Sequence, residues 1–348
     1  MSTRYDSDSS GGALDAKSGG LRLGHLALPG RVFVAPMSGV SDRPFRDACH
    51  RLGASLVVSE MVASEELVRE KPQVLRRATS GEARPFVMQL AGREAYWMAE
   101  GARIAEALGA DIIDINMGCP AREVTGKLSG SALMRDLDHA QSLIEAVAGA
   151  VSVPVTLKMR MGWDHATLNA PELARRAEAA GVQLITVHGR TRCQFYKGRA
   201  DWAFVREVKH AVRLPVIVNG DIATSNDAVK ALTESGADGV MIGRGAYGRP
   251  WIASQIERTL TSGSDPGSPS LVEQAEIAVR HVEAMLQLYG THLGLRNARK
   301  HIGWYLEASG RPSAVTKIWR ARLCQDEDAG RVLAGLGLFY NEPEAIAA

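Results

Sequence analysis

The ten residues that decide the fold prediction are Asp111-Ile112-Ile113-Asp114-Ile115-Asn116-Met117-Gly118-Cys119-Pro120. The isoleucines predict a short buried strand, and Gly118 and Pro120 predict a rigid turn directly after it. Cys119 would then lie at the carboxyl end of a strand, where α/β barrels place their catalytic residues. An ordinary thiol has a pKa of about 8.5 and is mostly protonated near neutral pH, so it can donate a proton. The alternative is that Cys119 is a small buried side chain without a chemical role.

Eight short apolar runs, separated by stretches with helical spacing, extend from Arg31 to about Trp251. This alternation predicts a (β/α)8 TIM barrel, and nearly all-apolar runs are typical of parallel strands covered on both faces. An open doubly wound sheet is the competing fold, but no Gly-rich dinucleotide fingerprint follows any run. The predicted strands are Val32–Ala35, Ser55–Ser59, Phe86–Leu90, Asp111–Ile115, Val155–Met159, Leu184–Val187, Val216–Val218 and Gly239–Ile242.

The Gly/Ser/Pro-rich segment 261–270 predicts a linker between a barrel domain, 21–260, and a small helical domain, 271–348. Residues 1–20 are polar and lack the apolar core of a signal peptide, so we expect a disordered leader. An acidic tail without a predicted element follows the last of three expected helices. These helices are Leu271–Tyr289, Thr291–Ala308 and Ser313–Cys324.

The composition is that of a soluble globular protein: of 348 residues, 45% are hydrophobic and 23% are charged. No apolar run is long enough to span a bilayer, so we expect no membrane association. Four scattered cysteines predict neither disulfides nor a metal site, and they fit a reducing cytoplasm. The net charge of +2 indicates no partner by itself, and a nucleic acid would need a local basic patch.

Polar residues recur just after the predicted strands, where an apolar core would otherwise continue. Their amide, imidazole and cationic groups, with almost no carboxylates, suit a planar ligand rich in acceptors with a phosphate tail. Each has an ordinary structural explanation alone, but their common position predicts a ligand site in the barrel mouth, and FMN fits it. The residues are Pro36-Met37-Ser38, Gln89, Asn116, Cys119, Lys158, Arg160, His188-Gly189-Arg190, Asn219-Gly220-Asp221 and Gly243-Arg244-Gly245.

The same residues carry a resemblance to a known family. The matching stretches are Ala35 to Arg46 (APMSGVSDRPFR), Asp114 to Pro120 (DINMGCP), Lys158 to Arg160 (KMR), His188 to Arg192 (HGRTR), Asn219 to Ile222 (NGDI) and Met241 to Arg244 (MIGR). In these motifs, and in their order, the chain resembles the tRNA-dihydrouridine synthases, most closely their bacterial B-type branch. Some relatives carry a nitrogen-regulation label, but nothing resembles a DNA-reading module, and no DNA partner is expected.

The resemblance implies an FMN enzyme that uses NADPH, with NADH as the alternative reductant, to reduce the 5,6-double bond of uridines in tRNA. It implies that the flavin passes hydride to C6, that Cys119 protonates C5, and that Lys158 favours the anionic reduced flavin. No dinucleotide motif is visible, so the reductant follows from the resemblance alone. The implied flavin contacts are Pro36, Met37, Ser38, Gln89, Lys158, His188, Asn219, Gly220, Asp221, Gly243 and Arg244.

The segment 291–322 contains seven Lys and Arg residues against one acid, Glu307. Arg296, Arg299 and Lys300 follow a three- and four-residue spacing that predicts one helical face. Such a basic stripe is typical of phosphate contacts, and the alternative is a solvated helix face. With the resemblance, this stripe predicts a tRNA-binding domain. The expected substrate contacts are Asn116, Arg160, Arg190, Arg192, Arg296, Arg299 and Lys300.

Two other functions remain open from the sequence. The first is an FMN barrel reductase of a free pyrimidine, like dihydroorotate dehydrogenase, which would leave the basic helical segment unexplained. The second is an RNA-binding protein that has lost its chemistry, against which the intact Cys119, Lys158 and His188 argue. The B-type likeness suggests a D-loop uridine, but the sequence does not establish the modified position or the oligomeric state.

Overall fold

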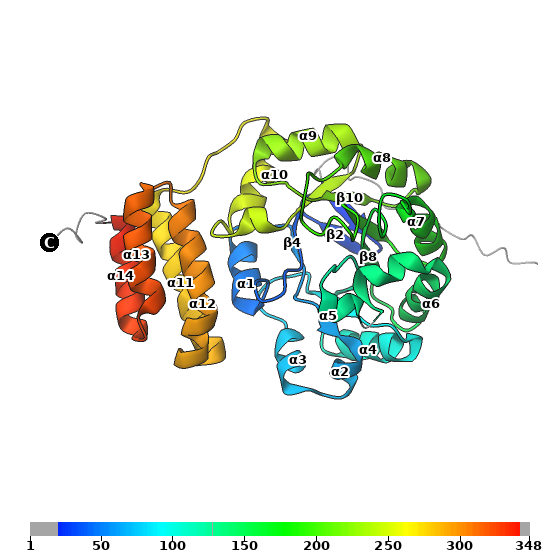
Figure 1. The fold of residues 1–348 in the computed structure, drawn as a ribbon, viewed down its shortest axis with the longest axis horizontal. Coiled ribbons are helices and arrows are strands. Elements are labelled where there is room, and N and C mark those ends of the chain that lie inside the picture. The colour runs from blue at the N-terminus through cyan, green and yellow to red at the C-terminus, as the bar shows by residue number, and fades with distance from the viewer. Residues whose placement is uncertain (1–19, 127, 342–348) are drawn as a thin grey trace, which may run out of the picture.

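The computed structural model describes residues 20–126 and 128–341, and the predicted leader lies outside them except for Gly20. Nine parallel strands curl into a barrel surrounded by helices, with further helices beside it (Figure 1). The ring closes because Leu56 pairs with Phe33 on one side while Val58 bridges to Val87 on the other. The strands are β3 (Val32–Val34), β4 (Leu56–Val57), β5 (Val62–Ala63), β6 (Val87–Ala91), β7 (Ile112–Met117), β8 (Val155–Arg160), β9 (Leu184–His188), β10 (Val216–Asn219) and β11 (Gly239–Ile242).

The barrel prediction is confirmed, and its errors lie at the strand ends. β4 and β5 derive from one segment, which bends between its contacts with β3 and β6. β7 continues to Met117 and β8 to Arg160, so Asn116 and Arg160 belong to ladder-paired strands and not to the loops after them. Polar residues can extend these strands because their side chains enter the barrel interior, where they find hydrogen-bond partners.

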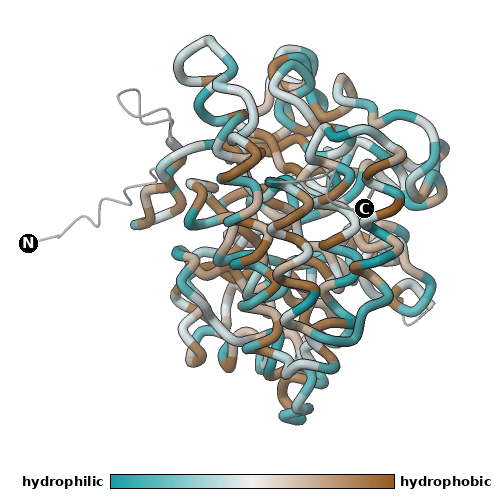
Figure 2. Tube along the Cα trace, turned by 90° about the vertical axis from the view of Figure 1, so that its left-hand side faces the viewer, coloured by the Kyte–Doolittle hydropathy of each residue, from teal (hydrophilic) through white to brown (hydrophobic). Residues whose placement is uncertain are grey.

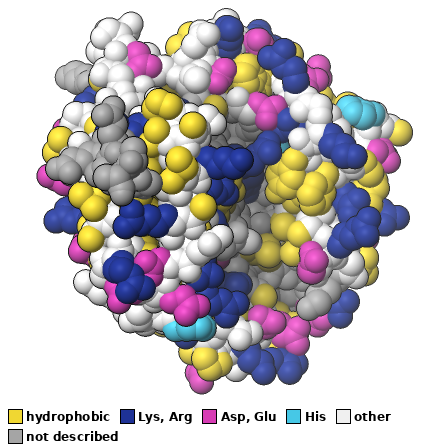
Figure 3. All heavy atoms as spheres, turned by 60° about the vertical axis from the view of Figure 1, so that its left-hand side comes forward, with side chains coloured by type: hydrophobic (Ala, Val, Ile, Leu, Met, Phe, Trp, Pro, Cys, Tyr) yellow, Lys and Arg dark blue, Asp and Glu magenta, His cyan; other side chains and the backbone are white. Residues whose placement is uncertain are grey.

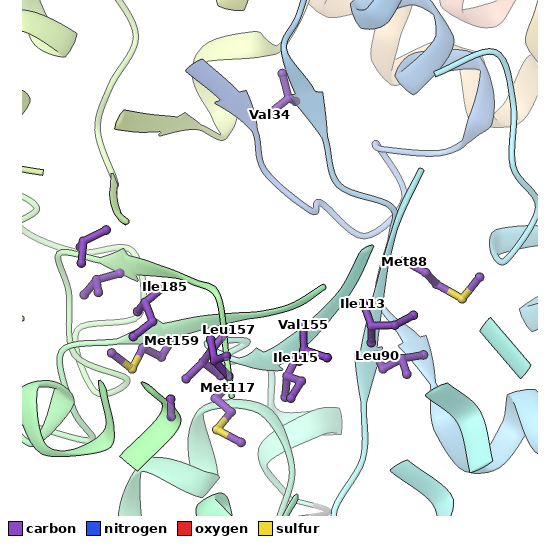
Figure 4. Close-up of a cluster of buried hydrophobic side chains, with 14 of the residues drawn as sticks. Val34, Met88, Leu90, Ile113, Ile115, Met117, Val155, Leu157, Met159 and Ile185 are labelled. Carbon is purple, nitrogen blue, oxygen red and sulfur yellow. The ribbon is translucent and has the colours of Figure 1, made fainter. Parts of the chain in front are cut away.

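Strand alternation separates two sets of side chains. On β7, Ile113 and Ile115 point outward to the helices, in a set that Figure 4 shows together with Leu157 of β8. Ile112, directly before Ile113, faces the interior, as do Asp114 and Asn116, two and four positions after it. The same strands therefore supply both the polar side chains of a ligand site and the apolar side chains of the core.

An N-terminal hairpin, β1 (Leu21–Leu23) paired with β2 (Leu26–Leu28), was not predicted. Its leucines pack against Phe33, Ile217 and Met241, which project into the amino-terminal part of the barrel. The hairpin therefore closes one end of the barrel with apolar contacts and leaves the carboxyl end for the ligand site.

Helices cover the outside of the barrel, and hydrophobic residues recur along their traces (Figure 2). Four of them begin with side-chain caps in which an aspartate or threonine accepts a backbone N–H, at Asp42, Asp136, Asp201 and Thr224. The helices are α1 (Arg43–Arg51), α2 (Ser64–Val68), α3 (Pro72–Arg77), α4 (Ala95–Ala107), α5 (Arg122–Thr125), α6 (Leu137–Ala148), α7 (Ala170–Ala179), α8 (Trp202–Ala211), α9 (Ser225–Ser235) and α10 (Ile252–Ser262), with short 3-10 turns at η1 (Gly130–Arg135) and η2 (Arg244–Ala246).

Four further helices form the C-terminal part, with their own apolar core around Trp319 and Phe339. They are α11 (Leu271–Tyr289), α12 (Thr291–Ala308), α13 (Ser313–Gln325) and α14 (Ala329–Asn341). The first three agree with prediction to within a residue, whereas the tail expected to lack an element forms α14. The predicted linker is two residues too long at its start, because α10 continues through Ser262 and ends at a left-handed Gly263.

The C-terminal helices dock on the barrel through α1 and the loop after β11. Phe45 of α1 lies with its ring centre 5.8 Å from that of His281 and 5.9 Å from that of His301. Tyr247 stacks on Trp304 with ring centres 3.9 Å apart. His301 and Trp304, which follow the basic stripe in the sequence, are therefore core and docking contacts. In the part of the chain that is described, no helix is both long and apolar enough to cross a membrane.

A substitution at Gly248 would test this docking of the C-terminal helices on the barrel. Gly248 has a φ of +66°, and a Cβ there would overlap the carbonyl group of Trp304 in α12. We expect Gly248→Ala to lower the free energy of unfolding by about 3 kcal/mol, from left-handed strain and forced separation of the two parts. Gly263→Ala is the matched control, because its φ is +77° and nothing lies within 4 Å of the added atom. Gly263→Ala should lower the free energy of unfolding, measured by urea denaturation, by about 1 kcal/mol. Equal losses in the two variants would contradict the docking role of Gly248.

Candidate active site

A cavity of about 760 Å3 opens at the carboxyl ends of the strands. Fifteen of the predicted site residues line it, and none of the predicted helical-domain residues does. Sequence reasoning missed Met61, Tyr196 and Arg249, which come from loops without a periodic signal. The predicted residues in the lining are Pro36, Met37, Ser38, Gln89, Asn116, Cys119, Lys158, Arg160, His188, Asn219, Gly220, Asp221, Gly243, Arg244 and Gly245.

A chain of directed hydrogen bonds runs through the base of the cavity and ends at the cysteine loop. Gln89 Nε2 donates to Asp114 Oδ2 at 2.7 Å, and Gln89 Oε1 accepts from Asn116 Nδ2 at 2.7 Å. Asn116 Oδ1 then accepts the backbone N–H groups of Gly118, at 3.1 Å, and Cys119, at 3.0 Å. An ionised carboxylate only accepts, so Asp114 sets the orientation of both amides and, through them, the position of the cysteine backbone.

Asp114 anchors this chain from a fully enclosed position. Thr156 Oγ1 donates to its second oxygen at 2.6 Å. Burial raises the pKa of Asp114 to about 6, against the opposing effects of its hydrogen bonds with Thr156 and Gln89 and of the nearby Lys158 charge. The sequence signal that could have identified Asp114 is its position two residues before Asn116, which puts both on the inner face of β7.

Lys158 lies across the cavity and donates to Asn219 Oδ1 at 3.1 Å. Asn219 Nδ2 in turn donates to the Met241 carbonyl at 2.8 Å. Burial, with a further effect from the Arg160 charge, lowers the pKa of Lys158 to about 8. Burial also lowers the pKa of His188 well below its usual value, so its imidazole is neutral near pH 7.

Glycines form the wall between β10 and η2. Gly220 has a φ of +115°, and a Cβ on it would overlap the His188 ring, so only glycine fits. A Cβ on Gly243 would meet no protein atom within 4 Å, which leaves room for a ligand to approach the backbone. Asp221 accepts from Arg190 Nη2 at 2.6 Å and lies 3.7 Å from Arg244 Nη2. Asp221 therefore holds the two arginines and also lines the cavity, where its direct ligand contact stays a prediction.

Cys119 is partly exposed to the cavity and has a free thiol. Its loop is fixed at the carbonyl groups: Ser131 donates to the Cys119 carbonyl through both N–H, at 3.0 Å, and Oγ, at 2.8 Å. Arg160 Nε donates to the Gly118 carbonyl at 2.8 Å. The thiol is thereby held in the cavity on a turn whose backbone groups are satisfied on both sides.

The arginines predicted to contact substrate differ in exposure. Arg160 and Arg190 are each only 2% exposed and donate mainly to loop carbonyls, although Arg160 still lines the cavity. Both arginines therefore hold loops in place, a structural role that cannot be recognised from the presence of an arginine in the sequence. Arg192 reaches Thr125 Oγ1 at 3.3 Å and covers the Trp163 ring.

The predicted basic stripe on α12 is only partly a surface feature. Arg296 is exposed, whereas Arg299 and Lys300 are partly buried. Lys300 lines a second, smaller cavity between the barrel and the C-terminal helices. Within residues 20–126 and 128–341, no cluster of three or more His, Cys, Asp or Glu side chains could hold a metal ion.

A closed parallel barrel with a polar, cation-lined cavity at its carboxyl end defines the class of TIM-barrel enzymes. Solved structures with this fold include a 2-naphthoyl-CoA reductase, with a TM-score of 0.54, 12% identity, and coverage of 71% of this chain and 52% of that chain. Histamine dehydrogenase from Rhizobium sp. 4-9 also has a TM-score of 0.54, with 13% identity over 83% of this chain and 51% of that one. These similarities concern the fold alone.

The dihydrouridine synthase (Dus) family model matches residues 33–337. A probable tRNA-dihydrouridine synthase of Rhizobium leguminosarum bv. phaseoli is 53% identical over 89% of this chain and 95% of the relative. One from Rhodobacter capsulatus is 53% identical over 93% and 99%, and tRNA-dihydrouridine synthase B of Pseudomonas putida is 45% identical over 92% and 95%. The chain belongs to the dihydrouridine synthase family and is an oxidoreductase, and family membership supports a flavin cofactor.

The hydrogen-bond chain from Asp114 can be tested by stability. We expect Asp114→Ala to lower the free energy of unfolding by about 3 kcal/mol, because two buried donors lose a charged acceptor. Asp114→Asn should cost less than about 1 kcal/mol, since the Thr156 hydroxyl can rotate to accept from the new amide while Gln89 keeps its acceptor. Urea denaturation of both variants measures the difference. If Asn were as damaging as Ala, the two-acceptor role of Asp114 would be wrong.

Proposed function

We propose that this protein is an FMN-dependent, NADPH-driven tRNA-dihydrouridine synthase that reduces the 5,6-double bond of specific uridines in tRNA. The observation that carries the proposal is the pairing of a positioned thiol, Cys119, with a buried cation, Lys158, in one cavity. The relatives at about half identity, named as probable tRNA-dihydrouridine synthases, support the substrate class. A cytoplasmic location follows from the tRNA substrate.

The residues present fit a flavin mononucleotide. The volume suits a ring system with a ribityl phosphate, and Gly243 leaves a space that a Cβ would occupy. Arg244 is more than half exposed and available to an anionic group at that end. Gln89, Lys158 and Asn219 would meet the polar edge of the ring, and Pro36, Met37 and Ser38 would cover its face. His188, Gly220 and Gly243 would contact the ribityl phosphate.

When bound and reduced, FMN supplies a hydride to C6 of the uracil. Lys158, charged below about pH 8, stabilises negative charge that develops beside it. Asn116 and Arg160 line the space next to Cys119 and orient the uracil. The Cys119 Sγ holds the proton and delivers it to C5, and a positioned acid of this kind contributes about 10²- to 10⁴-fold. The neutral His188 adds no competing charge.

The tRNA partner would lie along the face between the barrel and the C-terminal helices. Figure 3 shows a deep hollow in this face with Lys and Arg side chains around it. The predicted cations that remain available to phosphates are Arg192, Arg296, Arg299 and Lys300, whereas Arg190 acts through Asp221. A uridine of folded tRNA must leave its stack to reach the cavity, which costs a few kcal/mol that backbone contacts offset.

Cys119→Ala tests the function and the role of the thiol together. We expect the purified variant to keep its flavin and its NADPH-dependent flavin reduction, and to lose at least 100-fold in the rate of dihydrouridine formation, because only the protonation step lacks its acid. Nucleoside mass spectrometry of tRNA from a strain lacking the enzyme, treated with NADPH and each protein, measures the product and its position. Cys193→Ala removes an exposed thiol and is the control.

Two results would contradict this assignment. Full activity of Cys119→Ala would remove the thiol from the mechanism while leaving the reaction intact. A wild-type flavoprotein that reduces a free pyrimidine but leaves tRNA unchanged would replace the proposed function with that of a free-base reductase.

Lys158 gives the cofactor site a pH dependence. Its lowered pKa of about 8 means that the ammonium is charged at pH 7 and loses its charge as the pH rises through 8. We expect FMN affinity for the apoprotein to fall about tenfold between pH 7 and pH 9, because a charge-assisted contact is lost. Lys158→Met should bind more weakly with no such fall, and Lys230→Met on the exposed part of α9 should behave as wild type. Flavin fluorescence titration distinguishes them, and a pH-independent wild type would refute the contact.

A further inference from the structure

A second cavity of about 210 Å3 lies where the barrel meets the C-terminal helices. Its walls come from the loop after β3, from α3, and from the corner between α11 and α12. Neighbouring residues face the two cavities: Ser38 and Met61 line the large one, and Gly39 and Glu60 line the small one. Consecutive Cα atoms are about 3.8 Å apart, so only two loop segments separate the cavities. A polymer with one unit in the large cavity therefore passes close to the small one.

The small cavity combines cations with one buried carboxylate. Arg76 and Arg77 are exposed on α3, and Lys300 is partly buried on α12. Glu60 is only 5% exposed, and its Oε1 accepts the Gly39 N–H at 2.6 Å. Arg77 Nε lies 4.0 Å from the same oxygen, beyond hydrogen-bonding distance. A carboxylate offers about four acceptor positions, so Glu60 retains capacity for a ligand donor.

One cation is held in place before any ligand arrives. The Arg76 guanidinium lies 5.8 Å from the centre of the Tyr289 ring, within the range of a cation–π contact. Tyr289 is fixed in turn by its hydroxyl, which donates to Asp42 Oδ2 at 2.9 Å. The α11–α12 corner therefore orients a cation of the barrel, and the cavity is complete only when both parts are docked.

We propose that this cavity binds one ribose-phosphate unit of the RNA next to the uridine that enters the active site. Glu60 accepts a hydrogen bond from the ribose 2′-hydroxyl, and Arg76, Arg77 and Lys300 meet the adjacent phosphate. A simple anion would be repelled by Glu60 and a simple cation by the arginines, whereas a ribose phosphate presents a neutral donor beside a negative group. The 2′-hydroxyl is the group by which proteins distinguish RNA from DNA. This inference rests on the proposed tRNA substrate.

The reductant is the other molecule that carries ribose and phosphate, and the cavity suits it less well. At about 210 Å3 the cavity holds a sugar phosphate but not an adenosine, since pockets for ligands of that size are about 300 Å3 or more. NADPH also replaces the adenosine 2′-hydroxyl with a phosphate, which would place a dianion beside Glu60. Both considerations favour the RNA backbone.

The test uses the full-length flavoprotein and synthetic tRNAs with one modified sugar, scanned over three nucleotides on each side of the reduced uridine. Each position carries either 2′-deoxy or 2′-fluoro. Fluorine keeps the ribose pucker but cannot donate a proton, so a carboxylate acceptor penalises both changes equally. We expect one position at which each modification weakens binding about tenfold in the wild type.

Three variants complete the experiment. In Glu60→Gln, which keeps an acceptor for the Gly39 N–H, the penalty at that position should fall below about twofold. Arg76→Ala combined with Arg77→Ala should weaken binding of all tRNAs about equally and flatten the salt dependence. Arg175→Ala, on the outer face of α7 and paired with Glu172, is the control for loss of a surface arginine away from both cavities and should bind as the wild type.

Each other outcome overturns the inference in a recognisable way. Uniform tolerance of modified sugars by an enzyme that still reduces tRNA removes the ribose contact but leaves the proposed function intact. An unchanged penalty in Glu60→Gln assigns the contact to another residue. If the double arginine variant raised the KM for NADPH and left tRNA affinity unaltered, the cavity would bind the reductant. A wild type that fails to reduce tRNA would refute both proposals. If Glu60→Gln did not fold, the fluoro scan and the arginine variant would still decide.

Discussion

The active site depends on one acceptor, the buried carboxylate of Asp114. Amide side chains can rotate to exchange donor and acceptor, so a chain of two amides has no intrinsic direction. Asp114 supplies the direction because its oxygens accept from Gln89 and Thr156. The amide of Gln89 then presents its oxygen to Asn116, and Asn116 presents its oxygen to the N–H groups that begin the cysteine turn. The backbone of Cys119 is thus positioned by a charge that the reacting atoms never contact.

The burial of that charge also has a cost. Transfer of a carboxylate from water raises the pKa of Asp114, and the Lys158 charge across the interior partly offsets the shift. Lys158 experiences the reverse effect, and its pKa falls for the same reason. Each ion lowers the cost of burying the other, although the hydrogen bond of the Lys158 ammonium goes to Asn219 and not to Asp114. The interior therefore holds two opposite charges at a distance, with amides between them. Such an arrangement can position a polar ring without neutralising the cation that the ring requires.

Much of the fold could be predicted because the barrel repeats one pattern eight times, and each repeat has its own apolar run and helix. The polar residues near Asn219 and Gly243 were located by the same logic, since parallel strands end at one face. The hairpin at Leu21–Leu28 was missed because a three-residue strand with alternating burial carries too little periodicity to stand out. Its role in closing the barrel is a tertiary contact, which no local pattern encodes.

Besides the hairpin, the sequence could not predict which charged side chains are buried. Arg190 and Arg192 are two positions apart in the same motif, yet Arg190 pairs with Asp221 inside the protein while Arg192 extends toward Thr125. The pairing of Asp114 with Gln89 was hidden for the opposite reason, because an aspartate within a strand of isoleucines resembles a boundary residue. Its significance becomes visible only when the alternation of β7 is compared with that of β8. Charged residues in a sequence thus identify a site only once the strand register shows which of them face the barrel interior and which face outward.

The junction between the barrel and the C-terminal helices determines how the site can meet a folded partner. Buried groups line it: His281 Nδ1 lies 3.0 Å from the Tyr305 hydroxyl within the C-terminal helices, and burial lowers the pKa of His281 to about 3. The imidazole is therefore neutral near pH 7 and contributes packing, not charge, to the junction. Phe45 packs on this histidine from the barrel side, so α12 keeps a constant distance from the cavity mouth. Under the proposed function, a fixed separation of this kind would let the helices select which nucleotide of a bound RNA reaches the cavity, because a uridine at another distance along the chain would place its phosphates out of register with the cations.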